Sequence, residues 1–175
     1  MVLIIIKIYE KITSDYIVGF IDGEGCFTLH IHKRATSSFN ICVTPSFSAS
    51  QNSTSVHVLE EIQDFFGCGF IRQDRKTSKY EVRDLKNLRL KILPFFQKNK
   101  LRTQKQQDFL LFCEICDLLI KKTHLTQSGI FKLIDLAYSM NQSGASRRKK
   151  KSHLLYEIEA YCAAKPEFCK VKATK

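Results

Sequence analysis

The stretch YIVGFIDGEGCF, from Tyr16 to Phe27, joins an apolar run typical of a buried helix to two carboxylates set among three glycines. Thr13 offers an N-cap hydroxyl ahead of this run, so the sequence predicts a helix from Ser14 to Gly23. After the last glycine, apolar and polar residues alternate, which indicates a strand with one buried face. Asp22 and Glu24 are therefore expected where a helix ends and a strand begins.

The rest of the pattern predicts an α+β domain built around a four-stranded antiparallel sheet. Further strands are expected at Phe39 to Ser50, Phe70 to Asp74 and Lys79 to Asp84, and further helices at Val56 to Phe66, Leu85 to Phe96, Thr103 to Lys121, Gln127 to Met140 and Ser152 to Ala163. The length and the 44% hydrophobic content are enough for one ordinary domain, so residues 1–175 are predicted to form a single domain. Within it we expect an N-terminal extension (1–12), a core (13–143), and a basic loop with a C-terminal helix (144–175).

The composition indicates a polyanionic partner. The 175 residues are 44% hydrophobic and carry a net charge of +11, which favours nucleic acid or an anionic membrane surface. The apolar start, MVLIII, is too short for a secretion signal or a membrane span, so no membrane partner is expected. The seven scattered cysteines are expected to be reduced thiols of an interior compartment. Absence of Trp with abundant Lys, Ile and Phe is compatible with an AT-rich organellar genome.

One face of the predicted sheet is polar and basic. No Asp or Glu occurs from Gly25 to Leu59. The segment from Arg72 to Lys91 contains eight basic residues and only three acidic ones. Readers of single-stranded RNA present exposed aromatics on a sheet, whereas these strands direct theirs to the core, so double-stranded DNA is the better fit. The expected DNA-binding residues are Thr28, His30, His32, Arg34, Asn40, Cys42, Thr44, Ser46, Ser48, Ser50, Arg72, Asp74, Lys79, Glu81, Arg83, Arg147, Arg148, Lys149 and Lys150.

Other site chemistry fits the sequence less well. The oxygen ligands of a calcium loop do not continue past Glu24, and no glycine-rich phosphate loop is present. Cys113 and Cys116 form a lone C-x-x-C inside a helical pattern, so core packing is favoured over zinc. His30 and His32 lack a third ligand, which favours DNA contact over metal binding.

Glu24 is the candidate metal ligand. A carboxylate at a helix C-terminus lies at the negative end of the helix dipole, which costs up to ~1 kcal/mol. A bound cation makes the electrostatic interaction at this position favourable instead. Glu24 and the carbonyls at the helix end are hard oxygen donors suited to Mg²⁺. One carboxylate makes a poor hydrolase, but Gly19 and Gly23 share a helix face and would allow two chains to pair closely.

At this point the residues resemble a known family. YIVGFIDGEGCF is similar to the signature of LAGLIDADG homing endonucleases of the single-motif, homodimeric type, and the resemblance extends through TPSFSASQNS, FFGCGFIR, LPFFQKNKLRTQKQQDFLLF and AYSMNQSG. It implies an αββαββα fold with a saddle-shaped sheet and C-terminal helices. It also implies Mg²⁺-dependent hydrolysis of both strands of a long, pseudo-palindromic DNA target across the minor groove, leaving short 3′ overhangs.

The resemblance also assigns roles. It implies that Glu24 and the Gly23 carbonyl bind metal, with two or three Mg²⁺ per dimer that Mn²⁺ or Ca²⁺ can replace, and that Asp22 is structural. Gln51 is expected to orient water, and either Lys105 or Lys100 is the active-site lysine. The implied dimer interface comprises Ile17, Gly19, Phe20 and Gly23.

The chain departs from relatives at two positions. Ser55 stands where some relatives carry a basic residue, and Lys79 where one subgroup carries an acid. The family type implies an intron-encoded protein of a mitochondrion or chloroplast. An RNA maturase that binds its host intron, or a relative that only binds DNA, is the alternative.

Overall fold

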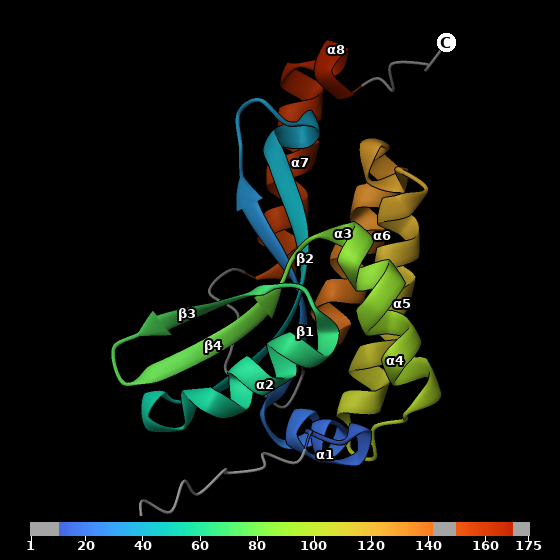
Figure 1. Ribbon diagram of the computed structural model, residues 1–175. Helices are drawn as coiled ribbons and strands as arrows, with labels where there is room; N and C mark the ends of the chain where they lie inside the picture. The colour runs from blue at the N-terminus through green and yellow to red at the C-terminus, as the bar shows by residue number, and fades with distance from the viewer. Residues whose placement is uncertain (1–10, 142–149, 170–175) are drawn as a thin grey trace, which may run out of the picture.

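The computed structural model describes residues 11–141 and 150–169, and its elements follow the predicted order (Figure 1). The first half comprises α1 (Ser14–Glu24), β1 (Gly25–Lys33), β2 (Ile41–Asn52), α2 (Val56–Phe66), β3 (Phe70–Asp74) and β4 (Thr77–Val82). The second half comprises α3 (Leu85–Asn87), a π-helical turn (Leu88–Ile92), α4 (Leu93–Lys98), α5 (Lys105–Ile120), α6 (Gln127–Ser139), α7 (Lys151–Ala164) and α8 (Pro166–Cys169). The predicted α+β order of helix, two strands, helix, two strands and helices is confirmed.

The four strands form one antiparallel sheet in the order β1-β2-β4-β3. β1 pairs with β2 from Gly25↔Ala49 to Lys33↔Ile41, and β4 lies between β2 and β3. Figure 1 shows α4, α5 and α6 gathered on one side of this sheet, with α2 packed along the β3–β4 hairpin and α1 at one end. One sheet face is therefore covered and the other is left open.

The covered face carries the core. Phe27 of β1 stacks on Phe47 of β2 with ring centroids 5.2 Å apart, and both contact Phe96 of α4. Tyr80 and Val82 of β4 complete the buried row. Since side chains alternate along a strand, this packing directs the intervening polar residues to the opposite face.

Several boundaries differ from the predicted ones: β4, for example, spans Thr77–Val82 instead of Lys79 to Asp84. Two of the differences have local reasons. β2 begins at Ile41 instead of Phe39, because Phe39 and Asn40 adopt positive φ angles of 61° and 56° in a 3₁₀ turn. The helix predicted at Leu85 to Phe96 is split by the π-helical turn, and Pro94 lies in the first turn of α4, where its missing amide is tolerated. No helix within the described ranges is long and apolar enough to cross a membrane.

Candidate functional site

The end of α1 is tied to the loop before α5 through Asp22. Its Oδ2 accepts a hydrogen bond from the Arg102 amide (2.7 Å), and its Oδ1 accepts from the amide (3.2 Å) and hydroxyl (2.8 Å) of Thr103. Asp22 therefore holds together two segments about eighty residues apart in the chain. This agrees with the structural role that the resemblance implied.

This loop brings Lys105 to the candidate metal ligand. Lys105 opens α5, and its Nζ donates a hydrogen bond to the Gly23 carbonyl at 3.1 Å. Lys100 is exposed, and it forms no hydrogen bond or ion pair with other described residues. Of the two candidate lysines, Lys105 is the one that contacts the Gly23 carbonyl within the described residues.

Glu24 is exposed at the junction of α1 and β1. Among residues 11–141 and 150–169, no hydrogen bond or ion pair engages its carboxylate. The next residue must be glycine, because a Cβ on Gly25 would collide with the Ile21 side chain and lie 2.6 Å from the Ile21 carbonyl. The tight junction thus leaves the unpaired Glu24 carboxylate exposed to solvent.

Gln51 lies close to this junction. Because Gly25 pairs with Ala49, the last residues of β2 run beside the end of α1. The Gln51 Oε1 accepts from the Asn52 amide at 2.7 Å, so its amide nitrogen keeps both N–H donors. Ser55, at the start of α2, makes no side-chain cap.

These donors suit a hard cation but do not enclose one. In the described part of the chain, no three His, Cys, Asp or Glu side chains come together as a metal site. Glu24 and the Gly23 carbonyl offer oxygen atoms of the kind that Mg²⁺ prefers. The residues present therefore fit part of a Mg²⁺ site.

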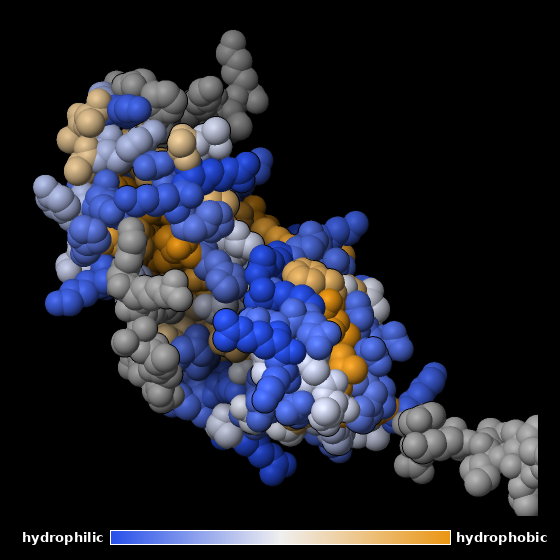
Figure 2. Space-filling model, turned by 90° about the vertical axis from the view of Figure 1, so that its left-hand side faces the viewer, coloured by the Kyte–Doolittle hydropathy of each residue, from blue (hydrophilic) through white to orange (hydrophobic). Residues whose placement is uncertain are grey.

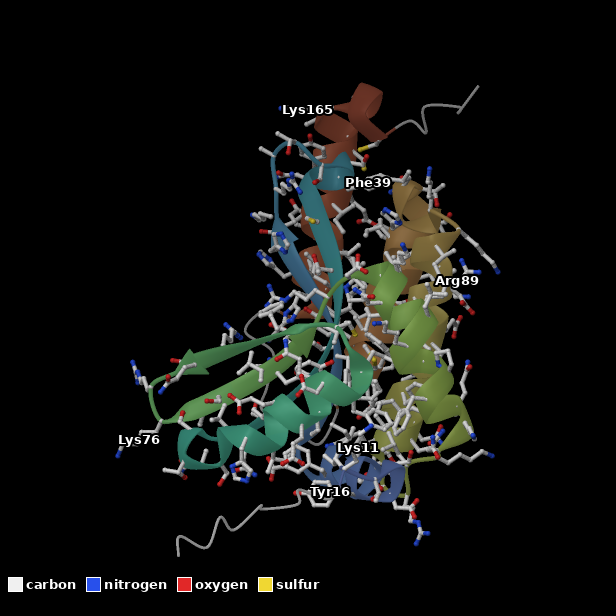
Figure 3. The ribbon with its side chains drawn as sticks, in the orientation of Figure 1. Lys11, Tyr16, Phe39, Lys76, Arg89 and Lys165 are labelled. Atoms are coloured by element: carbon white, nitrogen blue, oxygen red, sulfur yellow. The ribbon has the colours of Figure 1, made fainter. Side chains whose placement is uncertain are left out.

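The exposed face of α1 carries Tyr16, Gly19, Phe20 and Gly23. Tyr16 stacks on Phe20 with ring centroids 6.2 Å apart, and it lies at the edge of the molecule (Figure 3). A Cβ added to either glycine would have nothing within 4 Å among the described atoms. Ile17, predicted for the same face, is fully buried in the core, which corrects that part of the expected interface. Packing inside the subunit therefore does not explain the two glycines.

The structure brings most of the predicted DNA-binding side chains together on the open sheet face. The strand register and alternation place there Thr28, His30, His32, Cys42, Thr44, Ser46, Ser48, Ser50, Arg72, Asp74, Lys79, Glu81 and Arg83. The surface on the side of β1 and the β3–β4 hairpin is dominated by hydrophilic residues (Figure 2). Arg34 and Asn40 lie at the turn between β1 and β2, where the Arg34 amide donates to the Asn40 carbonyl.

Three of these residues are not accessible as expected. Ser46, Ser48 and Glu81 lie on the open face but are almost completely buried, so the prediction that they contact DNA directly is corrected. β2 is an inner strand, and the Ser46 hydroxyl donates a hydrogen bond to Glu81 on the neighbouring β4. Lys150 is exposed before α7, whereas Arg147, Arg148 and Lys149 lie outside the described residues.

Glu81 is the one acid buried in the middle of this face. Ser46 Oγ donates to its Oε1 at 2.6 Å, and Arg83 Nη2 lies 2.9 Å from its Oε2. Burial raises the pKa of Glu81, but the hydrogen bond from Ser46 and the cation of Arg83 outweigh this effect and lower the pKa below its usual value. Glu81 is therefore a charged group in a buried position.

Sequence reasoning missed Asn141. Its backbone amide donates a hydrogen bond to Asp108 Oδ1 at 2.9 Å, and its side-chain Nδ2 donates one to the Phe27 carbonyl at 2.8 Å. This anchors the chain to β1 and α5 directly ahead of the basic segment. The available signal was Asp108 itself, an acid on the buried side of an amphipathic helix.

The end of α1, the sheet and α5 all fall within one family pattern. The model of the LAGLIDADG endonuclease family matches residues 17–116. The chain belongs to the LAGLIDADG endonuclease family. The resemblance in the sequence and the expected fold are both confirmed.

Relatives of the LAGLIDADG chain include proteins of different length. "Probable intron-encoded endonuclease 2" of Neurospora crassa is 30% identical over 129 residues, which are 73% of this chain but only 27% of that protein. The homing endonuclease I-TnaI is 31% identical, with a TM-score of 0.78 over 85% of this chain and 99% of its own. I-SmaMI, solved on an uncleaved DNA target in the presence of calcium ions, is 33% identical, with a TM-score of 0.73 over 90% of this chain and 50% of that chain.

Proposed function

We propose that this LAGLIDADG chain is a site-specific DNA endonuclease that works as a homodimer and uses Mg²⁺. The observation that carries the proposal is the unpaired Glu24 carboxylate next to the Gly23 carbonyl that Lys105 contacts, at the edge of a polar and basic sheet face. An exposed acid next to a lysine in a surface that would meet phosphate is an arrangement for reacting with that phosphate. The DNA-bound structure of I-SmaMI supports the proposal that this chain binds a DNA target.

The chain's residues take distinct roles in this proposal. Glu24 and the Gly23 carbonyl would hold the ion, which when bound acts as a Lewis acid and lowers the pKa of water. The Lys105 ammonium, 3.1 Å from the Gly23 carbonyl, stabilises the negative charge that builds on the phosphate during attack. Gln51 orients the attacking water through its unused N–H donors.

Pairing of two chains would complete the site. α1 exposes two glycines that no packing inside the subunit requires, and glycine permits close approach of two helices. I-SmaMI matches this chain over half of its own length, which leaves room in one chain for two such units. A single-motif chain reaches the same arrangement by association, with a two-fold axis at α1.

The proposed substrate follows from the symmetry and from the family. A two-fold pair presents the same sheet face to both half-sites, so the target is pseudo-palindromic. By resemblance, cleavage crosses the minor groove and leaves short 3′ overhangs. The name of the Neurospora crassa relative supports an intron-encoded origin, for which we propose a mitochondrion or chloroplast.

The test is cleavage of a plasmid that carries the intronless insertion site of the host gene, with and without Mg²⁺. We expect double-strand cleavage only with the metal. A gel shift without cleavage would contradict the nuclease and indicate a protein that only binds DNA. Help with intron splicing in place of cleavage would instead indicate an RNA maturase.

A further inference from the structure

Glu81 lies at the centre of a ring of cations on the open sheet face. Its carboxylate is fully buried, whereas the basic side chains around it are partly exposed. Besides Arg83, the cationic or titratable groups within 4 Å of its oxygens are His30 Nε2 (3.7 Å), Arg72 Nε (3.7 Å) and Lys79 Nζ (3.8 Å). An acid in this position cannot reach a DNA base, so its effect must pass through these neighbours.

The two carboxylate oxygens have different surroundings. Oε1 accepts the short hydrogen bond from Ser46 and lies nearest His30 and Lys79. Oε2 faces the two arginines, with Arg83 Nη2 at 2.9 Å and Arg72 Nε at 3.7 Å. Ser46 therefore fixes the carboxylate, and the ion pairs hold the two guanidinium groups beside Oε2.

Arg83 is restrained from a second side. Its guanidinium carbon lies 6.0 Å from the centre of the Phe70 ring, within the range of a cation–π contact. Its side chain is still 43% exposed. An arginine held by an acid and a ring, with one edge open, is oriented before any ligand arrives.

We propose that Glu81 is a positioning residue for base recognition, which orients Arg83 and Arg72 toward the major groove without touching DNA itself. The inference rests on the proposed DNA-binding function. The guanidinium fork pairs with O6 and N7 of guanine, and an orientation set in advance reduces the entropy lost on binding. Without the acid, the same arginines are free to bind phosphates, which carry no sequence information.

The experiment compares Glu81→Gln, Arg83→Met and the double variant with the wild type. Glu60→Gln is the matched control, since it removes one negative charge from the exposed surface of α2. Each protein selects duplexes from a randomised library without Mg²⁺. Its Kd is then measured on the duplex that the wild type selects and on an unrelated duplex, at several salt concentrations.

We expect Glu81→Gln to lose a guanine preference that the wild type and Glu60→Gln keep. The Kd on the unrelated duplex divided by the Kd on the selected duplex should fall at least about fivefold. This is the lower end of the discrimination that one bidentate base contact provides. The slope of log K against log salt becomes steeper by about one, because a released arginine neutralises one more phosphate. A purely structural role of Glu81 would leave that slope unchanged.

The double variant decides whether Glu81 acts through Arg83. In the Arg83→Met background, Glu81→Gln should change the Kd ratio by less than about twofold, since coupled residues are not additive. An equal loss in both backgrounds, or an unchanged guanine preference in Glu81→Gln, would overturn the inference alone. If the wild type and Glu60→Gln select no sequence, the proposed function fails and this inference fails with it.

Ser46→Ala keeps the test valid if thermal unfolding shows that Glu81→Gln does not fold. This variant removes only the hydrogen bond that holds Oε1. It should weaken the same base positions as Arg83→Met, and an unaltered preference would overturn the positioning role.

Discussion

Replacing Asp22 with alanine should loosen the loop that carries Lys105 and so lower both stability and the cleavage rate. Three hydrogen bonds are lost, to the Arg102 amide and to the amide and hydroxyl of Thr103. A hydrogen bond to a charged group contributes about 1.5–3 kcal/mol. Because these donors are partly accessible to water, we discount the sum to about 1–3 kcal/mol in the free energy of unfolding.

The assay is thermal unfolding followed by circular dichroism at one fixed protein concentration, since association changes the apparent Tm. A loss of about 1–3 kcal/mol lowers the Tm by about 3–10 °C in a chain of this size. The control is Asp64→Ala, an exposed acid near the end of α2 that makes no hydrogen bond or ion pair within the described residues.

The activity of the same variant separates anchoring from simple destabilisation. Well below the Tm, Asp22→Ala should still bind DNA but cleave more slowly, because Lys105 no longer has a fixed position relative to Gly23. If its Tm stayed within about 1 °C of Asp64→Ala and its rate matched the wild type, the anchoring role of Asp22 would be refuted.

Four further variants test the proposed centre and its pairing. Glu24→Gln should fold and shift target DNA in a gel, but lose plasmid cleavage by about a hundredfold or more, because the neutral amide holds Mg²⁺ poorly; nicking at the wild-type rate would exclude it as a ligand. Lys105→Met should lower the cleavage rate by about a hundredfold with little change in the Kd for DNA, whereas Lys100→Met should change the rate by less than about threefold. The reverse ranking would make Lys100 the active-site lysine. Gly19→Leu should leave the Tm of the subunit close to wild type, since nothing lies within 4 Å of the added Cβ, yet sediment as a single chain and fail to make double-strand breaks; a paired and active variant would contradict the α1 interface.

The elements were predictable because each has a local cause. Thr13 caps α1, with its hydroxyl accepting from the Tyr16 amide, and glycines end the helix. Gly67 stops α2 in a left-handed conformation, with φ at 56°. Alternation then assigned the side chains of β1 and β2 to the correct faces.

What could not be predicted depends on contacts across the fold. Alternation tells which face Ser46 occupies but not that Glu81, 35 residues later, covers it. α1 is apolar on two sides, so its sequence does not reveal that Ile17 faces the core while Phe20 remains partly exposed. The contact of Lys105 with the Gly23 carbonyl, which favours Lys105 over Lys100 as the proposed active-site lysine, depends on the Asp22 hydrogen bonds, and these have no trace in the local pattern.

The length of β1 sets how much DNA one subunit can read. β1 runs over nine residues from Gly25, beside Glu24, to Lys33, near the turn at the far end of the hairpin (Figure 1). At about 3.4 Å per residue this is about 30 Å, which matches about nine base pairs of duplex. With α1 at the two-fold axis, Thr28 and Ser50 then address base pairs near the cut, and His32 and Cys42 address outer ones. We therefore expect the dimer to protect about 18–20 base pairs in a footprint, and protection of about ten or fewer would mean that the open sheet face does not lie along the groove.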